Sequence, residues 1–199
     1  MAFLLGLARG IDALNARVAR VTMWLVLGVT LIAAGNALVR KVFDVSSNAF
    51  LEIQWYLFSA IFLLCAADAL RRNAHVRIDV IAGRFSRRTQ AWIDVFGTLC
   101  FLFPMAFIVL ILSGEVFLEA WRSGETSPSA GGLMLWPARL LVPVGFALLI
   151  LQGASELIKR IAFLAGRGAD PLGAADAPSA EQALAADIVR SQQEKEGRA

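Results

Sequence analysis

The residues that could support chemistry are few in this 199-residue chain, and they form no catalytic pattern. It has one histidine, His75, and two cysteines, Cys65 and Cys100, both inside apolar stretches. These residues cannot supply the ligands of a structural zinc site, and one histidine cannot ligate a haem from both sides. Phosphate-binding loops, zinc-protease motifs and nucleophile elbows are also missing from the sequence. We therefore expect no catalytic residues, no metal site and no cofactor.

Four ionisable residues near the ends of apolar stretches are spaced to pair within a helix. Asp68 and Arg72 stand four residues apart, and so do Glu156 and Arg160. Side chains at i and i+4 are neighbours on a helix surface, so each acid can pair with the base that follows it. We expect two ion pairs near the membrane interface.

Glu52 and Gln54 stand about one turn inside an apolar stretch, where exposing a charge to lipid is costly. Helix geometry directs them to different faces, and a hydrogen bond to a partner helix is worth about 0.6–2 kcal/mol in membranes. We predict that both contribute to a subunit interface. No chain of acidic residues crosses the apolar stretches and no inverted repeat is evident, although transporter cores usually show such features. The chain is therefore poorly equipped to carry a substrate alone.

The composition of the chain is typical of a membrane protein. Hydrophobic residues make up 58% of the chain and charged residues 18%, against about 45–50% and about 25% in soluble domains. A spanning helix needs about 20 mostly apolar residues. The sequence predicts an all-α membrane protein with four spanning helices, at about residues 21–39, 50–70, 93–116 and 139–157.

Three regions follow from this pattern. Residues 1–20 form an N-terminal segment, residues 21–160 form the four-helix membrane domain, and residues 161–199 form a tail. The tail is rich in Ala, Gly, Asp, Glu and Gln, so we expect it to be disordered. The first apolar run is longer than that of a signal peptide, so we interpret it as an uncleaved span.

The distribution of cations predicts the orientation of the spans. Fifteen of the 19 lysines and arginines lie before the first span, between the second and third, or after the fourth. Cytoplasmic loops carry such an excess, so both termini are expected in the cytoplasm. Trp24 and Trp92 then fall near the inner boundary, and Trp55, Trp121 and Trp136 near the outer one. Because the cations flank the spans, the net charge of +3 does not indicate nucleic-acid binding.

Two connecting segments are candidates for contacts outside the membrane. Residues 71–91 are arginine-rich and contain Val80, Ile81 and Phe85, which favours a short interfacial helix; a basic loop that only fixes topology is the alternative. Ser86 is a candidate N-cap for the helix that follows. Residues 119–137 are dense in Gly, Ser and Pro and predict a structured turn, with an ordinary surface loop as the alternative.

With these motifs in order, the chain resembles the small integral-membrane subunit of tripartite ATP-independent periplasmic (TRAP) transporters, the DctQ type. The resemblance covers about residues 18–160. It rests on the order and spacing of six segments, and H-V-R-I-D at residues 75–79 is the most specific feature. The segments are 52–58 (EIQWYLF), 67–80 (ADALRRNAHVRIDV), 86–94 (SRRTQAWID), 124–127 (GETS), 136–137 (WP) and 142–153 (VPVGFALLILQG).

The resemblance implies a non-catalytic small permease subunit of a sodium-coupled secondary transporter for organic acids such as dicarboxylates. Such subunits pair with a large multi-span permease subunit, which carries the substrate and sodium sites and moves against them. A periplasmic substrate-binding protein delivers the substrate. The expected partners are therefore these two proteins and membrane lipid, with no nucleic acid.

Two sets of residues follow as candidate sites. His75, Arg77 and Asp79 are expected to join Glu52 and Gln54 at the interface with the large subunit. The outer loop is expected to help receive the binding protein, through Arg122, Gly124, Glu125 and Ser127. The alternative functions are a membrane-anchor subunit of a redox or other enzyme complex, against which the single histidine argues, and a small self-contained channel or exporter.

Overall fold

The computed structural model describes residues 2–44, 47–73, 85–166 and 168. The chain divides into two units, Met1–Gly168 and Ala169–Ala199, and everything below concerns the first. Its elements are α1 (Ala2–Phe43), α2 (Asn48–Arg71), α4 (Arg87–Gly97), the π-helical segment η1 (Thr98–Leu102), α5 (Phe103–Ser123) and α6 (Trp136–Leu164). α4, η1 and α5 run on as one helical stretch, and with α1, α2 and α6 they give four helices long and apolar enough to cross a membrane. The predicted all-α fold with four spans is confirmed.

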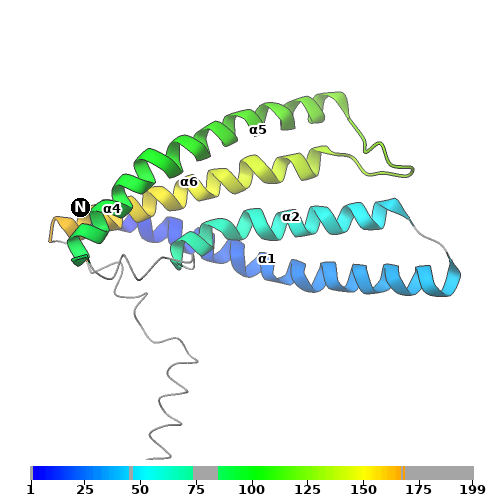
Figure 1. Ribbon diagram of the computed structural model, residues 1–199, viewed down its shortest axis with the longest axis horizontal. Helices are drawn as coiled ribbons and strands as arrows, with labels where there is room; N and C mark the ends of the chain where they lie inside the picture. Colours follow the sequence, from blue (N-terminus) through cyan, green and yellow to red (C-terminus); the bar gives the residue numbers. More distant parts are fainter. Residues whose placement is uncertain (1, 45–46, 74–84, 167, 169–199) are drawn as a thin grey trace, which may run out of the picture. The chain divides into compact units, whose positions relative to one another are not determined.

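Helix α6 is the central element of this unit. It packs against α1 and α2 and also against α4 and α5. In Figure 1, α5, α6, α2 and α1 follow one another across the unit, so α5 reaches the other long helices mainly through α6. Large apolar side chains such as Trp24, Phe62 and Phe101 point outward and are about 70% exposed, as surfaces that face lipid require.

The helices approach closely because small residues lie between them. The buried apolar side chains are mostly alanines, among them Ala60, Ala67 and Ala106. A Cβ atom at Gly145 would lie 2.9 Å from the Leu63 Cβ of α2, and one at Gly153 would lie 2.8 Å from a ring carbon of Phe103. Membrane helices associate through such small-residue contacts, because lipid supplies no hydrophobic drive between them.

The third spanning helix contains a local widening next to a proline. Pro104 stands at the start of α5 and has no N–H to donate to the preceding turn. The five residues of η1 lie just before it, and the Phe103 N–H bonds to the Thr98 carbonyl, five residues back. A π-helical turn of this kind re-satisfies carbonyl groups that an α-helical ladder would leave open.

The observed helix ends agree in part with the ends that the sequence predicts. Ser86 caps α4, as predicted, by accepting a hydrogen bond from the Thr89 N–H at 3.2 Å. Helix α1 begins at Ala2, so it includes residues that the sequence assigns to a segment before the span. Its 42 residues correspond to a length of about 63 Å, twice the hydrocarbon thickness of a bilayer.

Candidate functional site

Two clusters of polar side chains lie at opposite ends of the unit. The loop end is the end with the 124–135 connection and the start of α2. The terminal end is the end where α1 and α4 begin and α2 and α6 finish (Figure 1).

At the loop end, Glu52 of α2 holds the α5–α6 connection in place. Its side chain accepts a hydrogen bond from the Ser127 hydroxyl and another from the Leu133 N–H, at 2.7 Å. Glu52 is only 5% exposed as a result. We call Glu52, Ser127 and Leu133 the loop clamp.

The connection itself is ordered by its own backbone. Thr126 and Met134 form an antiparallel bridge, and the Ser127 N–H bonds to the Leu133 carbonyl at 2.9 Å. Gly124 ends α5 in the left-handed conformation, with φ of 62°. A Cβ atom at Gly132 would lie 2.5 Å from the Ser127 Cβ, so only glycine permits this close approach. The predicted structured turn is therefore present.

Further contacts fasten the connection to α2 and α6. The Tyr56 hydroxyl donates to the Met134 carbonyl at 3.1 Å, and the Asn48 amide donates to the Ala130 carbonyl at 3.2 Å. Glu125 and Arg139 form an ion pair at 2.7 Å, with both side chains partly exposed. The rings of Trp121 and Trp136 meet edge to face with centroids 4.6 Å apart, so these two tryptophans do lie at the same end of the bundle.

The candidate residues at the loop end divide into two groups. Glu52 makes its hydrogen bonds within the chain, and Gln54 bonds to the carbonyl of Phe50 on its own helix at 2.8 Å. Arg122, Gly124 and Glu125 are exposed, and Ser127 is half-buried. The sequence indicated that Glu52 needs a polar partner, but its partner here is an intramolecular loop, so the subunit-interface role stays a prediction.

At the terminal end, a buried network joins α1 to α6. Gln152 is fully buried and lies at its centre. The Asn15 amide donates to the Gln152 side-chain oxygen at 2.7 Å, and the Gln152 amide donates to Asp12 at 2.8 Å and to Glu156 at 3.1 Å. Ser155 also donates to Asp12, at 2.8 Å. Three of these four hydrogen bonds join α1 to α6, and the side-chain oxygen of Asn15 is buried without a partner.

Two cations complete the network. Lys159 pairs with Asp12 at 3.1 Å and also with Glu156. Arg160 pairs with Glu156 at 2.6 Å and with Asp94 of α4 at 3.0 Å, and it reaches the Asn73 side chain after α2 at 3.5 Å. The buried network is thus Asp12, Asn15, Asp94, Gln152, Ser155, Glu156, Lys159 and Arg160.

Both predicted ion pairs form, one of them exposed and the other buried between helices. Asp68 pairs with Arg72 at 2.6 Å and additionally with Arg71 at 2.8 Å, and the Arg72 side chain is 64% exposed. The side chains of Glu156 and Arg160 are each only 4% exposed, so this pair is buried within the unit, and its depth in the membrane stays a prediction. Helices α1 and α4 cover it, because α1 extends back to Ala2 and α4 begins at Arg87.

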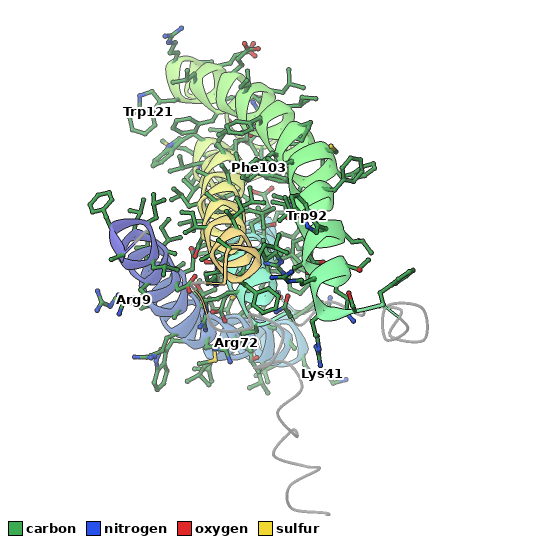
Figure 2. All side chains as sticks on the ribbon, turned by 90° about the vertical axis from the view of Figure 1, so that its left-hand side faces the viewer. Arg9, Lys41, Arg72, Trp92, Phe103 and Trp121 are labelled. Carbon is green, nitrogen blue, oxygen red and sulfur yellow. The ribbon has the colours of Figure 1, made fainter. Side chains whose placement is uncertain are left out.

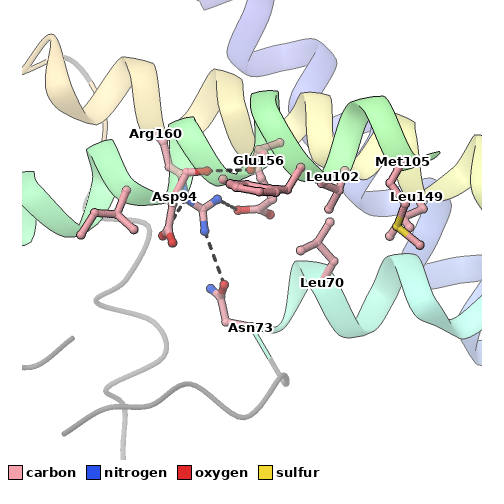
Figure 3. Close-up of a pocket in the computed structure, with 12 residues that line it drawn as sticks. Leu70, Asn73, Asp94, Leu102, Met105, Leu149, Glu156 and Arg160 are labelled. Atoms are coloured by element: carbon pink, nitrogen blue, oxygen red, sulfur yellow. Dashed lines mark hydrogen bonds and ion pairs between the residues drawn. The ribbon is translucent and has the colours of Figure 1, made fainter. Parts of the chain in front are cut away.

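Beside the network lies an apolar groove between α2, the α4–α5 stretch and α6. It has a volume of about 520 Å³ and is lined by apolar side chains including Leu70, Leu102, Met105 and Leu149. Arg160 with its two carboxylates closes it at the terminal end, as Figure 3 shows. No group of acidic, histidine or cysteine side chains within the described ranges could hold a metal ion.

Of the buried network, the sequence predicted only the Glu156–Arg160 pair. A signal was present, since Gln152, Ser155, Glu156 and Lys159 recur at three- and four-residue spacing on α6, and Asp12 and Asn15 do so on α1. The candidate residues His75, Arg77 and Asp79 lie outside the residues that the structure describes.

Comparison with known proteins identifies the family. Residues 29–163 match the family model described as tripartite ATP-independent periplasmic transporters, DctQ component. No curated protein and no solved structure matches the chain. The matched region contains α2, α4 and α5, nearly all of α6 and the loop clamp. The chain therefore belongs to the DctQ family, the small permease component of TRAP transporters.

Proposed function

We propose that this chain is a non-catalytic scaffold subunit of a sodium-coupled TRAP transporter for organic acids. It packs against a large multi-span permease subunit in the membrane as a scaffold and helps a periplasmic substrate-binding protein to dock. The chain lies in the bacterial inner membrane with the terminal end in the cytoplasm and the loop end in the periplasm. The cation distribution supports this orientation, because the terminal end carries most of the arginines beside the spans.

The observation that carries the proposal is that the buried polar side chains of the described residues have hydrogen-bond partners within the chain, with the Asn15 side-chain oxygen as the exception. Gln152 and Glu156 have intramolecular partners in the buried network, and Glu52 has them in the loop clamp. A carrier needs polar groups at membrane depth that exchange partners with its substrate or ion. Polar groups engaged in this way suit a static part of the transporter, against which the large subunit moves.

The loop end has the properties of a docking surface. Arg122, Gly124 and Glu125 are exposed on a connection that the loop clamp and the Glu125–Arg139 pair hold in one conformation. An ordered loop loses less conformational entropy when a partner binds, and its charges act mainly on the association rate. We infer that the binding protein contacts this connection.

The interface with the large subunit is proposed to include Gln54 together with His75, Arg77 and Asp79. Gln54 is half-buried, and its side chain bonds only to its own helix, so its remaining polar capacity suits a neighbouring helix. The H-V-R-I-D motif carries the other three residues, and its support is the family resemblance.

Uptake into proteoliposomes that contain both membrane subunits tests this division of roles. Glu52→Ala should release the connection and raise the binding-protein concentration that gives half-maximal uptake. The rate at saturating binding protein and the sodium dependence should stay at wild-type values. Arg72→Ala is the matched control, because the Arg72 side chain is 64% exposed and follows the other end of α2, away from the loop. A change in sodium dependence in the Glu52 variant would contradict the scaffold role.

A further inference from the structure

The first half of α1 has three distinct faces. Ala8, Asn15, Ala19 and Thr22 are buried and face the other helices. A second face is apolar and outward: Phe3 is 82% exposed, and Leu7 and Leu14 follow it at four and eleven residues, 49% and 44% exposed. A third face has cations as its only charged residues: Arg9, Arg17 and Arg20, all exposed.

The buried network determines how this half of α1 lies against the spans. Asp12 contacts Lys159 at the charged end of α6, and Asn15 contacts Gln152 about two turns before that end. Arg17 and Arg20 stand five and eight residues beyond Asp12 toward the loop end. At 1.5 Å per residue they lie about 8 Å and about 12 Å farther along α1, beside the apolar part of α6. Arg17 and Arg20 are both exposed. With the terminal end in the cytoplasm, as proposed above, and the charged end of α6 among the headgroups, their Cα atoms lie where headgroups give way to acyl chains.

Arginine at such a depth needs an anion within reach. Side chains on a helix lean toward its N-terminus, which for α1 is the terminal end. Arg17 and Arg20 can therefore extend along the helix toward the headgroup layer, with their methylene groups against acyl chains. Figure 2 shows Arg9 directed away from α6 and the other helices. The only carboxylate within Ala2–Phe43 is Asp12, which the network already engages.

We propose that this half of α1 is a binding surface for anionic phospholipid. Phosphate groups contact Arg9, Arg17 and Arg20, and acyl chains cover the neighbouring stripe of Phe3, Leu7 and Leu14. A cationic stripe beside an apolar stripe on one helix matches the two chemical parts of a phospholipid at the membrane interface. Each cation near an anionic membrane surface adds about fivefold to the affinity. The surface lies on the chain alone, so the proposal is independent of the transport role.

Thermal unfolding of the purified full-length chain in detergent tests the proposal. The probes are phosphatidylglycerol and phosphatidylcholine with identical acyl chains, and the measurement is the shift in midpoint that each lipid gives. Phosphatidylglycerol should stabilise the wild type more than phosphatidylcholine does. Arg17→Gln with Arg20→Gln should abolish this difference. The matched control is Arg40→Gln with Lys41→Gln, two exposed cations at the other end of the same helix, which should preserve it.

Two further measurements distinguish the other possible results. If the glutamine variant does not fold, the wild type is measured at about 1 M salt, where the Debye length falls to about 3 Å and the preference should vanish. A preference that survives in the glutamine variant, or in the wild type at high salt, overturns the proposal. Co-purification with the large subunit is measured in parallel. A glutamine variant that keeps its lipid preference and loses the large subunit would assign the surface to that protein, which also overturns it.

Discussion

Glu52 and Glu156 are both buried glutamates of one membrane unit, but different kinds of group stabilise them. Glu52 is 5% exposed and receives its hydrogen bonds from a hydroxyl and a backbone N–H, both neutral donors. Glu156 is 3% exposed and is paired with Lys159 and Arg160. The loop clamp therefore fastens one connection to α2, whereas the buried network joins helix to helix through charges.

This difference predicts that the terminal end stabilises the whole fold and that the loop end stabilises only the connection. Removing one member of a buried ion pair leaves an uncompensated charge, which costs far more than a neutral hydrogen bond. The terminal end should respond to substitution with loss of the whole fold, and the loop end with local loosening. The variants below test this contrast.

The largest effect is expected at Arg160. Arg160→Ala removes the buried cation that Glu156 and Asp94 share and leaves Glu156 with the partly exposed Lys159, which should destabilise the chain by about 3–5 kcal/mol. Thermal or denaturant unfolding in detergent measures it. Arg72→Ala is the control, because the Arg72 side chain is 64% exposed and Asp68 keeps Arg71, so its cost should be below about 1 kcal/mol. Equal losses of unfolding free energy in the two variants would show that the buried network stabilises the fold no more than an exposed ion pair does.

A smaller and more local effect is expected at Glu52. Glu52→Ala removes the acceptor for the Ser127 hydroxyl and the Leu133 N–H. Amide hydrogen exchange within residues 124–135 should accelerate about tenfold, the factor that one net hydrogen bond represents. Exchange in α6 around Gln152 should not change. Acceleration of similar size in both places would mean that the two ends are not separate.

The smallest effect is expected at the exposed pair of Glu125 and Arg139. Both side chains are partly exposed, at 44% and 30%, so the pair should contribute at most about 1 kcal/mol. Arg139→Gln should leave the unfolding midpoint nearly unchanged. A loss comparable with that of Arg160→Ala would show that the loop end also supports the fold.

The four spans and the Ser86 cap were predictable because both depend on local sequence. Apolar length identifies a span, and a serine directly before a helix identifies an N-cap. The partners of Glu52 were not predictable, since Ser127 stands 75 residues away and meets it only after α5 and α6 have packed. Asn15 and Gln152 are separated by 137 residues, so their contact depends on how α1 lies against α6. The arginines at 17 and 20 also led the sequence analysis to begin the first span at residue 21, although tertiary packing continues the helix back to Ala2.

Hydrogen exchange of the assembled transporter during uptake tests the scaffold account most directly. The complex of both membrane subunits is compared at rest and during turnover, with a sodium gradient, substrate and binding protein present. The account predicts unchanged exchange across residues 152–160, because the buried network stays closed while the large subunit moves. It also predicts slower exchange in residues 124–135 when the binding protein is bound. Faster exchange across residues 152–160 during turnover would contradict the account, since the small subunit would then open and close with the transport cycle.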